Sequence, residues 1–210
     1  MNLRSIAYFL GLLCFPISIL AFINILYSNY FNFFLSINTY VITLFASLIL
    51  GTTFYFLGKN SQKRLNFVEL FLFIIFAYLV ISALISIPYY LSNYQISFID
   101  SLFESFSGVT STGFTIFDNV KYIDPTLVLW RSSSQWIGGL YFLVFLVIIF
   151  SKQEFKFRLT NLTFNSEENI NNTENIKDLI LKIFLLYLSS TILIFVILNI
   201  SNVRLFNALN

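Results

Sequence analysis

The residues most able to do chemistry in this 210-residue chain form a hydroxyl-rich run, Thr110, Ser111, Thr112, Gly113 and Phe114. If the run is extended along an axis, its backbone carbonyl oxygens can replace the water shell of a cation. Gly113 permits a backbone torsion that a residue with a Cβ resists. The pattern therefore predicts a cation-binding loop. The alternative is a surface loop whose hydroxyl groups only cap a short helix beside it.

Composition excludes several other kinds of site. The chain has no His and a single Cys, which excludes imidazole base catalysis, His-ligated zinc or iron, an intramolecular disulfide and multi-cysteine metal sites. A net charge of +2 is too small and too dispersed to indicate nucleic-acid binding. An intramembrane enzyme should carry acids or His at membrane depth, and Asp100 and Glu104 are spaced as the cap and scaffold of a helix. We therefore expect no enzymatic activity and no cofactor.

The elements that must position this loop belong to a membrane protein. Hydrophobic residues make up 58% of the chain and charged residues 10%, with a mean hydropathy of +0.82, whereas soluble proteins average about 25% charged residues. A helix that crosses a bilayer needs about 20 mostly apolar residues. Apolar runs predict five such helices, at about residues 6–27, 39–57, 70–91, 126–150 and 179–200.

Basic residues in the short loops predict the orientation, because cytoplasmic loops are enriched in Lys and Arg. They lie before the first span, after the second and after the fourth: Arg4, Lys59, Lys63, Arg64, Lys152, Lys156 and Arg158. The N-terminus is therefore predicted to be cytoplasmic and residues 92–125 to lie outside. Two triplets that match the glycosylation pattern, 161–163 and 171–173, then fall in a cytoplasmic loop and are expected to be plain polar residues.

Residues 97–107 predict a helix that does not cross the membrane. About ten residues span about 15 Å, half the thickness of a bilayer, and Ser97 and Asp100 have the spacing of a capping box. Gly108 is expected to close this helix in the left-handed conformation. Irregular backbone exists at membrane depth only where protein buries it or it lines water. Helix and loop together predict a re-entrant pore loop, and the C-terminal end of the helix dipole favours a cation there.

Several residues around the loop are candidates for its support: Asp100, Glu104, Arg131, Gln135, Gly138 and Gly139. Two roles are open for Arg131. It can anchor its helix at the membrane interface beside Trp130, or it can pair with Glu104. The paired glycines are expected to allow close helix packing rather than to contact ions.

Two segments closely resemble the first pore loop and the following helix of TrkH-type potassium uptake proteins, in the Trk/Ktr/HKT superfamily. They are DSLFESFSGVTSTGFT, from Asp100 to Thr115, and LWRSSSQWIGG, from Leu129 to Gly139. The resemblance implies four helix–pore loop–helix units around a central pore, preceded by two extra helices. It also implies that a potassium ion is the substrate and that residues 110–114 are one of four selectivity-filter segments.

On this resemblance, the fold is that of an all-α integral membrane protein in four parts. Residues 1–66 are the two extra N-terminal transmembrane helices, and residues 67–150 are the first helix–pore loop–helix unit. Residues 151–177 are a cytoplasmic linker, and residues 178–210 are the first helix and the start of the pore helix of a truncated second unit. One loop supplies about a quarter of a four-loop ring. The chain is therefore expected to be incomplete and not to conduct alone.

The resemblance also implies partners and a location. The expected partners are membrane lipid, the missing remainder of the transporter, a second copy in a homodimer and a cytoplasmic nucleotide-binding regulatory subunit. The expected location is the bacterial inner membrane, as a multi-pass protein. Gly rather than Ser at position 113 favours potassium within the superfamily. The remaining alternatives are a sodium-permeable member of the superfamily and a membrane scaffold that transports nothing.

Overall fold

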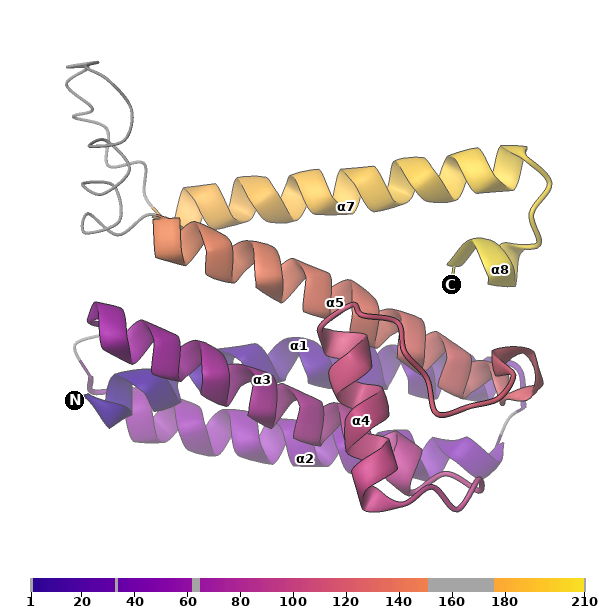
Figure 1. Ribbon diagram of the computed structural model, residues 1–210, viewed down its shortest axis with the longest axis horizontal. Coiled ribbons are helices and arrows are strands. Elements are labelled where there is room, and N and C mark those ends of the chain that lie inside the picture. The colour runs from indigo at the N-terminus through magenta and orange to yellow at the C-terminus, as the bar shows by residue number, and fades with distance from the viewer. Residues whose placement is uncertain (1, 33, 62–64, 151–175, 210) are drawn as a thin grey trace. The chain divides into compact units, whose positions relative to one another are not determined.

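The computed structural model describes residues 2–32, 34–61, 65–150 and 176–209, and their regular structure is all helical (Figure 1). The elements are α1 (Leu3–Tyr30), α2 (Phe34–Gly58), α3 (Phe67–Tyr90), α4 (Phe98–Val109), the 3-10 turn η1 (Val120–Tyr122), α5 (Pro125–Phe150), α7 (Ile176–Ile200) and α8 (Leu205–Leu209). The predicted all-α fold is confirmed. Almost all of the predicted linker at 151–177 lies outside the described residues, as do both glycosylation-like triplets and most of the basic residues that predict the orientation.

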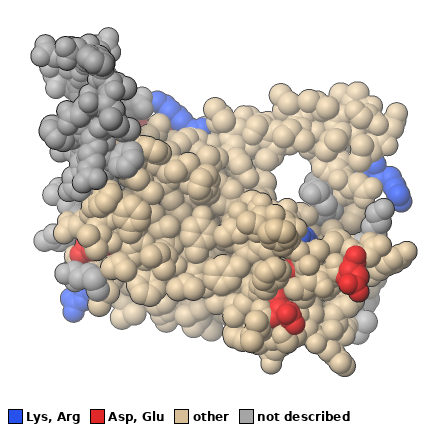
Figure 2. All heavy atoms as spheres, in the orientation of Figure 1, with Lys and Arg blue, Asp and Glu red and all other residues tan. Residues whose placement is uncertain are grey.

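Five helices of the described chain are long and apolar enough to cross a membrane. They are Leu3–Tyr30, Ile37–Gly58, Phe67–Tyr90, Pro125–Phe150 and Asp178–Ile200. Each corresponds to one predicted span. A helix suits a membrane because it bonds its backbone N–H and C=O groups within itself. Figure 2 shows that uncharged side chains cover most of the face drawn there. The chain is a multi-pass membrane protein.

The chain forms two compact units, Met1–Gly139 and Leu140–Asn210. The boundary between them falls within α5. The sequence predicts four parts, at residues 1–66, 67–150, 151–177 and 178–210. Two units do not test a division into four, so it stays a prediction.

In the first unit, α1 and α2 approach each other closely through glycines. A Cβ added to Gly11 would lie 2.6 Å from the backbone nitrogen of Tyr55 and 2.7 Å from the backbone oxygen of Gly51. A Cβ added to Gly58 would lie 2.4 Å from the backbone nitrogen of Tyr8. Small residues let helices in a membrane come within backbone contact, where packing and not hydrophobicity holds them together.

The start of α3 carries a buried acid that lies beyond the predicted third span. Glu69 accepts a hydrogen bond from the backbone nitrogen of Asn66 at 2.9 Å and another from the backbone nitrogen of Asn2 at 2.5 Å. Asn66 and Glu69 form a capping box, which moves the helix start from the predicted residue 70 to Phe67. The Asn-x-x-Glu spacing is the sequence signal that finds it.

The first half of α5 is fixed to α3 and α2 by one aromatic residue and its neighbours. The buried Trp130 donates its indole N–H to the carbonyl oxygen of Ile85 at 3.0 Å. Its ring lies 5.6 Å from that of Tyr40, whose hydroxyl donates to Thr126 Oγ1 at 3.3 Å. A buried indole N–H needs such a partner, so these contacts set how α5 enters the bundle.

The second unit consists of the rest of α5 together with α7 and α8. After α7, the backbone nitrogen of Val203 donates to the carbonyl oxygen of Leu198 at 3.1 Å, and α8 follows within a few residues. This short helix begins where the resemblance expects a second pore helix to start. That assignment stays a prediction.

Candidate functional site

The short helix α4 begins at the predicted cap. The Ser97 hydroxyl accepts a hydrogen bond from the backbone nitrogen of Asp100 at 3.1 Å and donates one to Asp100 Oδ2 at 2.7 Å. In a full capping box the acid would reach the backbone nitrogen of the cap residue, whereas here it holds the cap's hydroxyl. The cap gives α4 a fixed starting point.

The buried face of α4 is its small and polar face. It consists of Ser101, Glu104, Ser105, Ser107, Gly108 and Val109. The phenylalanines lie on the other side, with Phe98 57% and Phe103 49% exposed within the chain. A soluble amphipathic helix would bury the phenylalanines instead. Small residues on the inner face allow α4 to sit close to its neighbours.

The prediction that Gly108 ends α4 in the left-handed conformation is wrong. The helix runs through Gly108, and the residue with positive φ is Ser111, at 54°. The backbone nitrogens of Ser111 and Thr112 donate to the carbonyl oxygens of Gly108 and Ser107 at 2.9 and 3.1 Å, which is the Schellman pattern. Gly108 packs closely against α5, because a Cβ there would lie 2.3 Å from Ser134 Oγ and the serine side chain would have to shift.

The predicted loop, Thr110, Ser111, Thr112, Gly113 and Phe114, begins within this helix end, and all five residues are exposed within the chain. Thr110 has φ of −86° and ψ of 0°, and Ser111 has φ of 54°, so the first two residues are not extended as predicted. Gly113 has φ of +80°, and a Cβ built on it would meet nothing within 4 Å. Glycine is therefore favoured at this position by its backbone torsion and not by lack of space.

Two of the five loop carbonyl groups are already hydrogen-bonded to side chains of the same unit. Arg131 Nη2 donates to the carbonyl oxygen of Gly113 at 3.0 Å and to that of Phe114 at 3.4 Å. The Ser107 hydroxyl donates to the Phe114 carbonyl oxygen at 2.6 Å. The carbonyl oxygens of residues 110–112 accept no hydrogen bond within the described part of the chain. Three of the five carbonyl oxygens therefore have no hydrogen-bond partner among the described residues, and two are bonded.

Glu104 ties the chain after the loop to both helices. Its Oε2 accepts from the backbone nitrogen of Ile116 at 3.0 Å, and its Oε1 accepts from the hydroxyl of Thr115 at 3.3 Å. Oε1 also forms an ion pair with Arg131 Nη1. The Glu104 side chain is 0% exposed and that of Arg131 12%. Of the two roles left open for Arg131, the structure contains the pairing with Glu104.

Of the other predicted supports, Gln135 contacts the loop through its backbone oxygen, and Gly138 lies against the last residue of α4. The Ser111 hydroxyl donates to the backbone oxygen of Gln135 at 3.3 Å, so position 135 contributes no side-chain group to this bond. A Cβ on Gly138 would lie 2.0 Å from the carbonyl oxygen of Val109. Gly138 therefore lets α5 touch the backbone of α4. Gly139 beside it is half-buried.

The chemistry available at this site is coordination by neutral oxygen atoms. Among the described residues, no group of three or more His, Cys, Asp and Glu side chains could hold a metal ion. Backbone carbonyl and hydroxyl oxygens suit a monovalent cation that gives up part of its water shell. Arg131 and Glu104 neutralise each other next to the loop, so the pair adds no net charge.

Sequence reasoning missed two residues of this site. Ser107 bonds the Phe114 carbonyl, and Thr115 bonds Glu104. Their hydroxyl groups lie on either side of the predicted run, and this position is the only feature of the sequence that could have indicated their role. It is weak, because Ser and Thr in apolar helices usually bond their own backbone.

The family model that describes TrkH cation transport proteins matches residues 36–206. The uncharacterized cation transporter MJ1485 of Methanocaldococcus jannaschii is 29% identical over 151 residues, which cover 72% of this chain and 31% of that protein. The Trk system potassium uptake protein TrkH of Halomonas elongata is 30% identical over 150 residues, covering 71% and 31%. TrkG of Escherichia coli is 30% identical over 115 residues, covering 54% and 24%.

A solved structure has the same fold. The crystal structure of the potassium transporter TrkH from Vibrio parahaemolyticus matches 100% of this chain and 42% of its own, with a TM-score of 0.82 at 24% identity. The chain therefore spans less than half the length of each of these proteins. At this identity, the likeness to the crystal structure concerns the fold alone.

Proposed function

Because the chain belongs to the TrkH family of cation transport proteins, we propose that it forms part of a potassium uptake transporter. In this proposal, residues 110–114 supply one selectivity-filter loop. The role is one of transport and not of enzyme catalysis. The N-terminus lies in the cytoplasm, and the loop opens toward the outside.

The observation that carries the proposal is the way the loop is held. Arg131 and Ser107 bond the carbonyl oxygens of Gly113 and Phe114, while those of residues 110–112 have no partner in the described chain. A surface loop would turn free carbonyl groups to bulk water without needing a buried ion pair behind it. Fixed oxygens with no protein partner are what ion dehydration requires.

The helix before the loop supports a cation as the substrate. α4 points its C-terminal end at residues 110–112, and the partial negative charge of a helix C-terminus favours cations. The half-bilayer length of α4 would carry that end toward the membrane interior.

Three further parts of the transporter belong to the same proposal. One loop gives about a quarter of a four-loop ring, so we expect transport to need three more loops from a longer protein or from other chains. A second copy and a cytoplasmic nucleotide-binding subunit are the partners that the resemblance suggests.

The test uses a hybrid transporter in which this chain replaces the matched part of the Halomonas elongata TrkH protein, expressed in a bacterial strain that lacks potassium uptake. Gly113→Ala should lower potassium uptake per inserted protein by at least about tenfold, because a Cβ strains the +80° torsion and misdirects the neighbouring carbonyl oxygens. Gly113→Ser should in addition raise the ratio of sodium to potassium uptake.

The controls separate transport from folding. Membrane abundance and thermal stability should change little in Gly113→Ala, because its Cβ meets no atom. Unchanged uptake per inserted protein would favour the scaffold alternative. The chain expressed alone should not restore uptake.

A further inference from the structure

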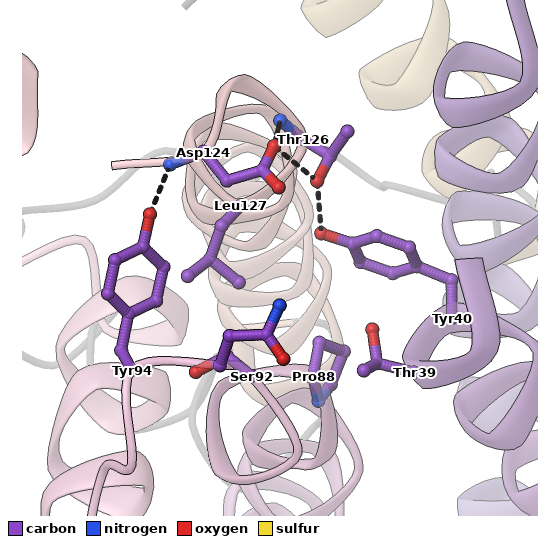
Figure 3. A pocket seen from close by; sticks show the side chains of 9 residues that line it. Thr39, Tyr40, Pro88, Ser92, Tyr94, Asp124, Thr126 and Leu127 are labelled. Carbon is purple, nitrogen blue, oxygen red and sulfur yellow. Dashed lines mark hydrogen bonds between the residues drawn. The ribbon is translucent and has the colours of Figure 1, made fainter. Parts of the chain in front are cut away.

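A second site lies in the first unit, at the end where α2 begins, α3 ends and α5 begins. A cavity of about 280 Å³ opens there, away from the loop residues described above. Its walls include Tyr40, Tyr94, Pro88, Leu127, Asn93 and Asp124 (Figure 3). The volume is close to the lower end of the range for small-molecule pockets, which suits a small polar group and not a large ligand.

Among the described residues that line this cavity, Asp124 is the only charged one. Its Oδ1 accepts from the backbone nitrogen and the hydroxyl of Thr126, each at 2.9 Å. Its Oδ2 accepts no hydrogen bond from any described residue, and Asp124 forms no ion pair with one. A carboxylate oxygen left open beside a cavity favours a cationic hydrogen-bond donor.

Two tyrosine rings stand on either side of this carboxylate (Figure 3). The Tyr94 hydroxyl accepts from the backbone nitrogen of Asp124 at 2.7 Å, and the Tyr40 hydroxyl donates to Thr126 Oγ1 at 3.3 Å. Both hydroxyls are thus bonded to residues that line the cavity, and both tyrosines also line it. Aromatic rings within about 6 Å attract an organic ammonium group through the cation–π interaction.

The level of the cavity in the membrane points to the source of such a group. The candidate spans begin at Ile37, end at Tyr90 and begin again at Pro125. The cavity lies where these three ends meet, and the ends of spans lie at the level of the lipid headgroups. In a membrane that contains aminophospholipids, their headgroup amines lie at this depth.

We propose that this cavity binds the primary ammonium group of an aminophospholipid headgroup such as that of phosphatidylethanolamine. The ammonium donates to Asp124 Oδ2 between the rings of Tyr40 and Tyr94, and the headgroup phosphate stays at the open mouth. A bound headgroup would link α2, α3 and α5 at one end of the bundle. The site is independent of the filter proposal.

The test measures lipid retention by the purified full chain with native mass spectrometry, after reconstitution with phosphatidylethanolamine or phosphatidylcholine. Asp124→Asn should weaken phosphatidylethanolamine binding by at least about tenfold. Asn caps a helix as well as Asp does, so α5 keeps its start. Asp118→Asn removes the same charge from an exposed acid that does not line the cavity and should bind as the parent does.

A second variant tests the aromatic wall. Tyr94→Leu, at a ring that is 45% exposed, should also lower retention. Displacement of the lipid by millimolar ethanolamine would support ammonium recognition. Equal retention of both lipids by the parent chain, or equal retention of phosphatidylethanolamine by the parent and Asp124→Asn, would overturn the proposal. Binding of free ethanolamine without binding of the lipid would overturn the lipid as its source.

Discussion

Glu104 and Arg131 form an ion pair from which water is almost excluded, with side chains 0% and 12% exposed. A buried pair is weak evidence of stability in itself, but removing one partner leaves a charge uncompensated. This pair does more than neutralise itself. Its acid also holds the backbone of Ile116, and its base holds the carbonyl oxygen of Gly113. The pair therefore fixes the chain at both sides of residues 114–115.

Replacing Glu104 with Gln tests this role at the level of one residue. The amide keeps the size of the side chain and an acceptor for Ile116, but leaves Arg131 without its counter-charge. We expect a loss of about 3 kcal/mol of stability, the lower end of the range for breaking a buried pair, together with loss of potassium uptake in the hybrid transporter. Thermal unfolding in detergent and uptake per inserted protein measure the two effects.

Asp100→Asn is the matched control for that variant. Asp100 lies on the same helix but is exposed, and its side chain bonds only the cap residue Ser97. Its replacement should cost less than about 1 kcal/mol and leave uptake intact. A similar loss in both variants would mean that charge on α4, and not the pair with Arg131, matters.

The end of α4 shows why part of the site could not be predicted from residue types. Glycine is the usual residue for a left-handed helix end, so Gly108 was the natural choice. The glycine instead lies where α4 approaches Ser134 closely, and Ser111 takes the left-handed torsion three residues later. The preference of glycine for the left-handed helix end was therefore outweighed by the contact between α4 and Ser134, which is distant in sequence.

As elements, α4 and α5 meet backbone to backbone. The Cβ of an alanine at position 138 would lie 2.0 Å from the carbonyl oxygen of Val109, the last residue of α4. No rotation of a side chain relieves such a contact. The loop therefore depends on the spacing of two helices as well as on its own residues.

Gly138→Ala should push the end of α4 away from α5 and destabilise the chain by about 1–3 kcal/mol, the usual cost of overpacking. Potassium uptake by the hybrid should fall with it. Because the obstacle is a backbone oxygen, adding Val109→Ala should not restore either property. Thermal unfolding and uptake assays distinguish these outcomes, and rescue by Val109→Ala would show that the side chain is the obstacle.

Ser133→Ala serves as a control on the same helix. The Ser133 hydroxyl bonds the carbonyl oxygen of Leu129 within α5 itself, at 2.7 Å. Its loss should therefore change stability and uptake little. A large effect would mean that α5 tolerates no substitution in this region.

On the scale of the whole molecule, the membrane made the spans predictable. Hydrocarbon demands that each crossing segment be apolar and helical, so runs without charge located all five candidate spans. Pairing with Glu104 was one of two open roles for Arg131, but the bonded carbonyl groups of Gly113 and Phe114 and the cavity beside Asp124 were not predictable. Each joins segments that are distant in the chain, and no local pattern records where those segments meet.

The predicted orientation can be measured with single cysteines. In a Cys14→Ala background, which removes the one native thiol, Asp118→Cys should react with a membrane-impermeant maleimide on intact cells. Lys59→Cys should react only after the membrane is opened, because cytoplasmic loops carry the basic residues. Both positions are exposed within the chain. The opposite labelling pattern would place the N-terminus outside.

The hydrogen bonds from Arg131 and Ser107 to the loop have a consequence for the resting protein. These bonds come from side chains of the flanking helices, so the loop at Gly113 and Phe114 is held without a bound ion. If residues 110–114 form a filter loop as proposed, we expect the loop to keep its conformation when external potassium is scarce and no ion is bound. An arriving ion would then meet carbonyl oxygens of Gly113 and Phe114 that are already positioned by hydrogen bonds.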